Sequence, residues 1–215
     1  MQRHICIYTN MEETNMETMT MMPENKEIRA IARGELKGNW TQPVLCTLVY
    51  LLVGAGIAVI PFVGSIAALL VTVPLSFGFI LTFLGFMRNQ NRDEMVGQPF
   101  KVFNEYGRYL GGSLLVSIFT ILWALLLIIP GIIKAYAYAM TPYIMKDQPE
   151  LSAVDCIDRS MSMMNGYKWK LFLLDLSFIG WALLCILTLG IGMLWLNPYV
   201  YCSRAQFYEE LKQRN

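Results

Sequence analysis

The few charged residues within the apolar parts of this sequence are the first candidates for chemistry. Lys134 and Asp175 both lie inside or at the edge of long apolar runs. A charge in the middle of a membrane costs roughly 2.5 to 3.5 kcal/mol on insertion scales, so such residues often mark an ion or substrate path. Lys134 also has a plainer explanation, because it follows an expected outer turn by three residues and can extend its amine to the outer interface. Asp175 is expected near the opposite, inner face, where it meets Lys168, Lys170 or a surface helix, or faces a shallow vestibule.

A second group of candidates is basic and lies beside a stretch rich in serine and methionine. Arg159, Lys168 and Lys170 belong to this group. Guanidinium and ammonium groups at a membrane surface attract anionic lipid headgroups. These three residues are therefore candidate contacts for lipid or for a partner protein. The alternative is an amphipathic segment that seals the bundle without binding anything.

The residue types needed for common catalytic sites do not come together. Ser160 and Ser162 have no identifiable base beside them, so a serine nucleophile is not expected. The only histidine, His4, stands in a polar leader, and the five cysteines are isolated from one another. We therefore predict no catalytic residues, no metal site and no cofactor. The net charge of +1 predicts no nucleic-acid partner.

The distribution of charge predicts a membrane protein. Hydrophobic residues make up 55% of the 215 positions and charged residues only 15%, against about 25% charged in soluble domains. Asp, Glu, Lys and Arg are absent from three long stretches, 38–87, 109–133 and 176–203. Uncharged apolar stretches longer than about 18 residues are typical of membrane spans.

These stretches are too long for three crossings, and turn residues divide each of them. We predict an all-α polytopic transmembrane bundle of six spans, arranged as three hairpins, with spans at about 43–60, 63–87, 109–129, 132–145, 171–189 and 193–202. The turns fall at Pro61 to Gly64, at Pro130-Gly131 and at Gly190 to Gly192. The second span of each hairpin contains a proline, at 74, 142 or 198, which is expected to kink the helix. Five glycines are expected at close helix contacts: Gly54, Gly56, Gly111, Gly112 and Gly180.

A short amphipathic helix is predicted to precede each hairpin and to lie on the membrane surface. The first covers residues 25–37. The second opens at Pro99 and places Phe100, Phe103, Tyr106 and Leu110 on one side. The third begins after Ser152 as its N-cap. Amphipathic helix, span, turn and proline-containing span thus occur three times in order, which indicates a weak internal repeat.

Basic residues set the orientation. With six spans, all of the 17 Lys and Arg residues except Lys134 fall on one side, which predicts that this side and both termini are cytoplasmic. A four-span alternative makes the second and third hairpins single kinked crossings, because 109–145 and 171–203 would extend only about 55 Å and 50 Å as helix. That alternative places Lys146, Arg159, Lys168 and Lys170 outside, against the usual bias.

The chain is predicted to hold one domain. Residues 1–23 form a methionine-rich leader without the apolar core of a signal peptide, expected to be disordered. A translation start at Met21 or Met22 would also explain it. Residues 24–211 form the membrane domain, and 212–215 are a tail.

Four motifs in order carry a resemblance to a known family. They are Asn25 to Trp40, with Arg29, Ala32-Arg33 and Leu36-Lys37-Gly38-Asn39-Trp40; Ile128 to Ile132 followed by Tyr136-Ala137-Tyr138; Ser160 to Lys168; and Leu176 to Trp181. Over residues 24 to 211 the chain resembles the bacterial DUF975 family. The resemblance implies a bacterial inner-membrane protein, distantly similar to membrane domains of some glycerophosphodiester phosphodiesterases. It implies no catalytic residue.

Two classes of function follow. The first is a non-enzymatic membrane protein that organises lipid or a partner at the inner face through its amphipathic helices. The second is a small transporter or channel with a path between the hairpins past Lys134. A transporter should show a polar seam through several spans, and here the spans offer mostly Ser, Thr, Tyr and Gly.

Overall fold

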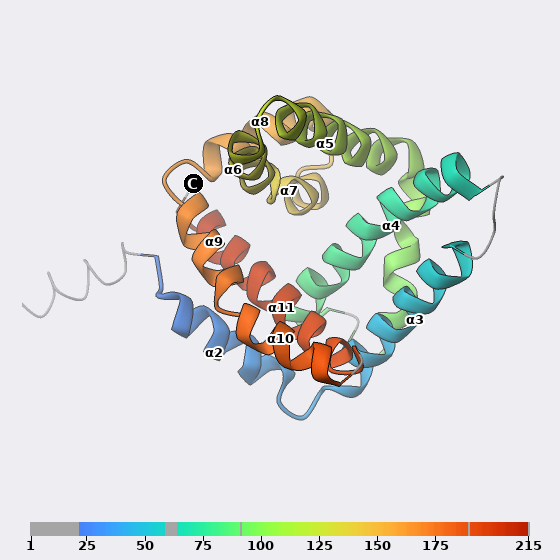
Figure 1. Ribbon diagram of the computed structural model, residues 1–215, viewed down its shortest axis with the longest axis vertical. Coiled ribbons are helices and arrows are strands. Elements are labelled where there is room, and N and C mark those ends of the chain that lie inside the picture. Colours follow the sequence, from blue (N-terminus) through green and yellow to red (C-terminus); the bar gives the residue numbers. More distant parts are fainter. Residues whose placement is uncertain (1–21, 59–63, 91, 189, 215) are drawn as a thin grey trace, which may run out of the picture.

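The computed structural model describes residues 22–58, 64–90, 92–188 and 190–214, and over these residues every regular element is a helix (Figure 1). The elements in chain order are α2 (Asn25–Leu36), α3 (Thr41–Ala58), α4 (Gly64–Met87), the 3-10 helix η1 (Met95–Glu105), α5 (Tyr106–Leu126), α6 (Ile128–Tyr138), α7 (Thr141–Asp147), α8 (Ala153–Met163), α9 (Lys168–Leu176), α10 (Ile179–Leu187) and α11 (Met193–Lys212). Residues 1–21 of the predicted leader lie outside the described part of the chain. Met22 is described, and it is buried.

Several helices are long and apolar enough to cross a membrane. Within the described residues these are Leu70–Met87, Met95–Leu125 and Lys168–Leu187, and α2 with α3 makes a fourth if that pair, bent by 97°, counts as one span. The helices α6 and α7 have 11 and 7 residues, about 16 Å and 10 Å of length, so neither crosses a bilayer alone. The chain is thus an all-helical protein with three to four candidate spans, which is compatible with a place in a membrane.

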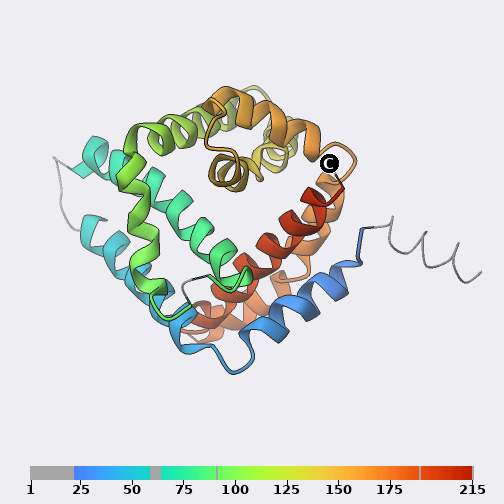
Figure 2. The same ribbon diagram turned by 180° about the vertical axis from the view of Figure 1, so that it is seen from behind.

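The helices form three groups around a closed ring (Figure 1). We call residues 25–87 the first unit, 95–147 the second unit and 153–212 the third unit. Each unit begins with a short amphipathic helix that packs on the preceding unit: η1 on α3 and α4, and α8 on α5, α6 and α7. The ring closes because α2 of the first unit packs on α11 and α9 of the third. Figure 2 shows α2 beside α11 and η1 across α3 and α4.

The first amphipathic helix agrees with its prediction. Ile28, Ala32 and Leu36 recur at helical spacing and are fully buried in α2. Ile31, expected on the same face, is 40% exposed. Gly38 follows the helix with a φ of +85°, a left-handed conformation that glycine adopts without steric cost.

The second amphipathic segment differs from its prediction. It is a 3-10 helix that starts at Met95, and Pro99 lies inside it instead of opening it. Its buried side carries Met95, Pro99 and Val102, whereas Phe100 is exposed. The reason is the fit to α4, where a Cβ atom on Gly78 would collide with the Pro99 carbonyl. Close approach at this glycine decides which side of η1 faces the protein.

The second predicted turn lies earlier than expected. Helix α5 ends at Leu126, Leu127 is extended, and α6 begins at Ile128. Pro130 therefore stands in the first turn of α6, where its missing N–H costs nothing. Gly131 allows α6 to return against α5, since a Cβ atom there would lie 2.5 Å from the Ala124 Cα atom.

The predicted span at 171–189 is divided in two. Helix α9 ends at Leu176 and α10 begins at Ile179. The Ser177 hydroxyl donates to the Leu174 carbonyl at 2.6 Å, a local bond that competes with helix continuation. The predicted turn near Gly190 agrees with a φ of +85° at that residue. The first predicted turn, at 61–64, lies outside the described residues except for Gly64.

Most of the glycines expected at helix contacts do not have that role. A Cβ atom would meet nothing within 4 Å at four of them, Gly54, Gly56, Gly111 and Gly180. Gly112 does face a neighbour, the Met145 side chain. Helix glycines on lipid-facing surfaces and at contacts look alike in sequence, so the prediction failed where the glycine points outward.

Pro74 lies inside α4 as expected, and its freed carbonyl has a partner. Proline cannot donate to the Leu70 carbonyl four residues earlier. The Tyr106 hydroxyl donates to that carbonyl instead, at 3.1 Å. A neighbouring side chain therefore supplies the bond that the proline removes.

Candidate functional site

The ends of three helices, one from each unit, meet in an ionic cluster. Arg88 follows α4, Asp147 ends α7, and Tyr208, Glu209 and Lys212 belong to α11. The Arg88 guanidinium donates to both Asp147 oxygens at 2.6 and 2.7 Å, and to Glu209 at 2.6 Å. Lys212 and Tyr208 donate to Asp147 at 2.6 and 2.9 Å. We call these five residues the ionic junction.

The ionic junction is electrostatically complete. Burial opposes ionisation of Asp147, but hydrogen bonds from Arg88 and Lys212 hold the pKa of that carboxyl well below its usual range. Burial and the adjacent Asp147 carboxylate raise the pKa of the Tyr208 hydroxyl. Every charge here has a partner, so the cluster ties the three units together and leaves no charge for a ligand.

Asp175 has a different partner from those predicted. The Arg204 guanidinium of α11 donates to its two oxygens at 2.9 and 2.7 Å, and the Tyr136 hydroxyl donates at 3.0 Å. Lys168, Lys170, a surface helix or a shallow vestibule was expected beside it, but no ion pair joins Asp175 to either lysine among the described residues. The break between α9 and α10 and the return of α11 bring Arg204 to this carboxylate. Asp175 and Lys134 do not pair, as expected.

A cavity of about 530 Å³ adjoins this second ion pair. Tyr136 and Arg204 form part of its wall, and most of the remaining lining is apolar side chain from α4, α5 and α6.

Lys134 makes no ion pair among the described residues. Its amine lies 5.0 Å from the centre of the Trp123 ring and 3.8 Å from the Met161 sulfur. Met161 belongs to α8, which packs along α5 and α6. A cation over an indole face is stabilised without a carboxylate. The expected position of Lys134 at the outer interface stays a prediction.

The three basic candidates do not line one cavity. Arg159 lines a small cavity with Asp147 and Lys212, of about 230 Å³. The Lys170 amine instead donates to the Met22 carbonyl at 2.6 Å. Their predicted role in lipid binding is a separate matter and stays a prediction.

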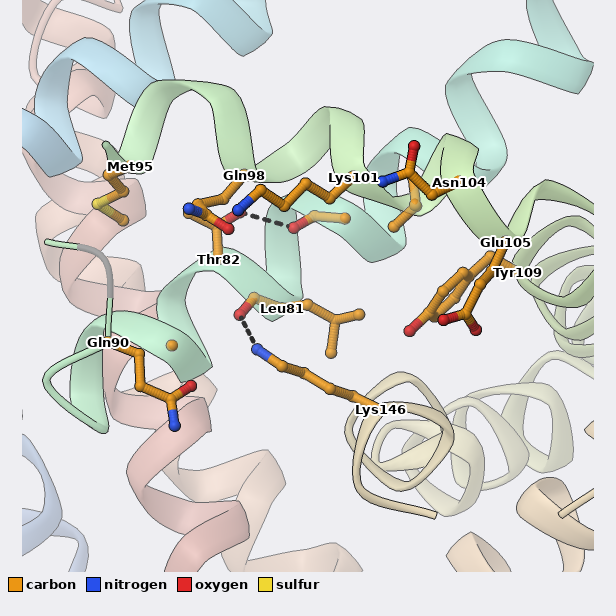
Figure 3. Close-up of a pocket in the computed structure, with 13 residues that line it drawn as sticks. Leu81, Thr82, Gln90, Met95, Gln98, Lys101, Asn104, Glu105, Tyr109 and Lys146 are labelled. Carbon is orange, nitrogen blue, oxygen red and sulfur yellow. Dashed lines mark hydrogen bonds between the residues drawn. The ribbon is translucent and has the colours of Figure 1, made fainter. Parts of the chain in front are cut away.

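A cavity with many polar residues in its lining lies between α4, η1 and α7 (Figure 3). It measures about 260 Å³, and its polar lining includes Thr82, Gln90, Gln98, Lys101 and Lys146. Figure 3 shows Gln98 and Lys101 extending from η1 towards α4, while Lys146 reaches α4 from the opposite side. We call this the η1 cavity. Three segments from two units are needed to build it.

Two hydrogen-bond donors that line the η1 cavity, the Lys146 amine and the Gln98 amide nitrogen, lack a close acceptor among the described residues. The Lys146 amine has one described hydrogen bond, a long one of 3.4 Å to the Leu81 carbonyl, and no carboxylate lies within 4.0 Å of it among the described residues. The buried amide nitrogen of Gln98 has no described acceptor. The one acid of the lining, Glu105, is largely exposed and faces Arg108 at 3.5 Å.

Electrostatics in the η1 cavity favour an anion. Burial lowers the pKa of the Lys146 amine, and the positive charges of Arg88 and Lys101 lower it further, against an opposing effect of Asp147 and Glu209. A buried ammonium close to other cations is costly unless a negative charge compensates it. The cavity can therefore hold an oxyanion by charge and hydrogen bonds. It offers no nucleophile beside a base.

The sequence analysis did not single out Lys101, Gln98 or Lys146. Lys146 was interpreted only as the end of a span, and Lys101 as the polar side of a surface helix. Nothing in their local sequence marks them, because the shared cavity depends on η1 packing on the preceding unit. No group of three or more His, Cys, Asp or Glu residues gathers in the described part of the chain.

Comparison with known proteins gives a family and no characterised relative. No curated protein and no solved structure matches the chain. The family described as "Protein of unknown function (DUF975)" matches residues 21–136 and again 125–215. Together the two matches cover nearly the whole ring of helices described above, and they overlap at the α5–α6 connection. The chain therefore belongs to the DUF975 family.

Proposed function

We propose that this chain is a non-enzymatic protein of the bacterial inner membrane that organises anionic lipid, or a partner bound there, at the cytoplasmic face. In this proposal six spans form three hairpins and both termini are cytoplasmic. The short helices α6 and α7 together make the fourth span, and the first half of α11 makes the sixth.

One observation carries this proposal: charged side chains gather where the units meet, whereas connections between helices expose apolar side chains. Arg88, Asp147 and Lys212 meet in the ionic junction. The connections from α5 to α6 and from α10 to α11 expose large apolar side chains to the surroundings, and these include Leu125, Ile128, Ile129, Leu187 and Ile191, which are 61 to 84% exposed. Water disfavours such a surface, whereas a bilayer accommodates it.

The contacts between α5 and α6 favour the hairpin over a single kinked crossing. The Phe119 and Tyr138 rings lie 6.4 Å apart, and Gly131 lies against Ala124. Ala124 and Gly131 lie three and four residues from Leu127, and Phe119 and Tyr138 lie eight and eleven residues from it. Residues farther from the connection in α5 thus contact residues farther from it in α6. The two helices therefore run antiparallel along each other.

Cysteine labelling tests the topology. Single cysteines at exposed positions of α8, Asp155→Cys and Asp158→Cys, are introduced after the native cysteines are replaced by serine or alanine. Six spans predict that a membrane-impermeant maleimide labels them only in inverted vesicles or opened cells. Labelling in intact spheroplasts would contradict the six-span topology.

Native mass spectrometry tests the lipid proposal. The protein is extracted from membranes in mild detergent, and retained lipids are identified by mass. We expect retained anionic phospholipid that is lost in an Arg159/Lys168/Lys170 triple substitution to glutamine. A protein that carries no anionic lipid, with affinity unchanged by the triple substitution, would exclude the proposal.

A transporter remains the second candidate because of the 530 Å³ cavity beside Asp175 and Arg204. This cavity places a polar pair next to apolar spans, as a substrate path requires. Solute or ion flux in proteoliposomes that is abolished by Lys134→Ala or Asp175→Asn would favour this function. Equal flux in protein-free liposomes would count against it.

A further inference from the structure

Each amphipathic helix lies where its own unit meets the preceding one, and the contents of these three junctions differ. Side chains of α2, α4 and α11 form one buried cluster, those of η1, α4 and α7 line the η1 cavity, and those of α8, α7 and α11 line the cavity of about 230 Å³. The junctions differ in whether a carboxylate accompanies the basic residues.

The first junction is filled by apolar side chains. Ala32 and Leu36 of α2, Phe83 and Phe86 of α4 and Cys202 of α11 form one buried cluster. Arg92, which follows α4, borders this cluster: it lies 4.6 Å from the centre of the Phe86 ring and pairs with Glu35 of α2. The protein supplies the negative charge for the basic residue at this junction.

The third junction contains basic residues together with their acid. Arg159 of α8 and Lys212 of α11 line the cavity of about 230 Å³, and Asp147 of α7 lies in the same wall. The Lys212 amine donates to Asp147 at 2.6 Å. The protein supplies the negative charge that these residues need.

The second junction, which is the η1 cavity, contains two basic residues, Lys101 of η1 and Lys146 of α7. No carboxylate lies within 4.0 Å of either amine among the described residues. The wall from α4 consists here of Gly78, Leu81, Thr82 and Gly85, with no carboxylate. The paired carboxylates of the other two junctions therefore have no counterpart at ion-pair distance from these two amines.

We propose that the η1 cavity binds a phosphoryl oxyanion through the amines of Lys101 and Lys146 and the amide nitrogen of Gln98. Lysine is a common ligand of phosphate because its ammonium donates in several directions. The amide donor is buried and unpartnered, which a bound oxygen would correct. A volume of about 260 Å³ is below the range of roughly 300 to 1,000 Å³ for drug-sized ligands, and suits a small headgroup.

The phosphoryl group could belong to free phosphate or to a phospholipid. In the second case the inference deepens the proposed function, and that part of it rests on the proposed function. The residues differ from Arg159, Lys168 and Lys170, so the two proposals can fail separately.

Thermal unfolding of the full chain in a neutral detergent provides the test. The probes are inorganic phosphate at low millimolar concentration, with chloride at equal ionic strength, and a short-chain phosphatidic acid below its micellar concentration. We expect one of them to raise the midpoint of the wild type, and a Lys101→Met/Lys146→Met double substitution to weaken its binding about tenfold or more. Lys26→Met, at an exposed lysine of α2 that does not line the η1 cavity, is the matched control and should leave the response unchanged.

The pattern of responses identifies the source. A response to inorganic phosphate that the double substitution removes indicates a free anion. A response to phosphatidic acid alone, again removed by the double substitution, indicates a lipid headgroup. If neither probe distinguishes the wild type from the double variant, the proposal is wrong. Loss of lipid retention in the Arg159/Lys168/Lys170 variant does not bear on this result.

A second variant keeps the test meaningful if loss of the lysines changes folding. Gln98→Glu places a carboxylate in the lining of the η1 cavity. We expect a higher midpoint without any added anion and a loss of the response to the probe. Gln148→Glu is the matched control, because Gln148 lines the third junction beside Asp147, and should not raise the midpoint. A lower midpoint for Gln98→Glu with an intact probe response would overturn the proposal.

Discussion

At the scale of residues, the basic side chains of this protein differ in whether the chain supplies their counter-charge. Arg88, Arg204 and Lys212 each have a carboxylate within 2.9 Å. Lys134 has an indole ring and a sulfur atom, and Lys146 has only a distant carbonyl. These differences depend on which helices meet. The free-energy cost of a charged residue in an apolar stretch can be recognised in the sequence, but its partner cannot.

Removal of Asp147 should destabilise the whole ring. In Asp147→Asn the Arg88 and Lys212 charges lose a buried carboxylate, which costs about 3 kcal/mol. The thermal midpoint in detergent measures this loss. The exposed Asp93→Asn is the control and should change stability by about 0.5 kcal/mol or less. Similar midpoints for the two variants would show that the ionic junction contributes little.

Acid should act through the same carboxyl. Because the pKa of Asp147 is lower in the folded chain, the unfolded chain binds the proton first as the pH falls. The stabilisation is therefore complete above the unfolded value of about 3.9 and disappears as the pH falls further. Between pH 6 and 3 the midpoint of the wild type should fall more steeply than that of Asp147→Asn. Parallel curves would contradict this.

At the scale of elements, apolar and helical periodicity predicted where helices exist better than where they end. The amphipathic helix at 25–37 and the N-cap at Ser152 agree with the structure. The helix break falls at Leu127, which is not a typical turn residue. Pro130 stands in the first turn of α6, and Gly131 allows the contact of α6 with α5. Sequence signals of turns and of close contacts use the same residue types, and only the packing separates them.

Two glycine substitutions distinguish these roles. Gly131→Ala forces a Cβ atom against the Ala124 backbone, which cannot retreat as a flexible side chain could, and should cost about 1 to 3 kcal/mol. Gly180→Ala has open space around it and should be neutral, or stabilising by up to about 1 kcal/mol through helix propensity. Thermal midpoints of the two variants provide the comparison. Equal tolerance at both positions would argue against the close α5–α6 contact.

At the scale of the whole molecule, the sequence predicted the class and the threefold order of elements but not the ring. The repeat of amphipathic helix and apolar segments is visible in the periodicity. That each amphipathic helix packs on the unit before it is a long-range relation, and a single sequence contains no pairing signal for it. The η1 cavity was missed for this reason, since Lys101 and Lys146 approach each other only when the second unit packs on the first.

Closure of the ring should couple the first helix to the last. Leu36→Ala removes a fully buried side chain of α2 and should cost about 2 to 5 kcal/mol. Hydrogen exchange should become faster in α11, its packing partner, before it does in α5. Ile31→Ala, at a 40% exposed position of the same helix, is the control and should leave α11 protected. Uniformly faster exchange across all helices would show that the ring opens as one body.

The packing of α2 on α11 also has a consequence for biosynthesis. The partner of α2 begins about 150 residues later in the chain, which corresponds to a delay of roughly 10 to 30 s at ordinary rates of translation. During that interval α4 can cover Ala32 and Leu36, but the part of α2 that packs on α11 has no protein surface to cover it, and the bilayer surface is the nearest apolar environment. We therefore expect α2 to rest on the membrane in the nascent chain and to leave it when α11 arrives, so the same apolar face serves two successive environments.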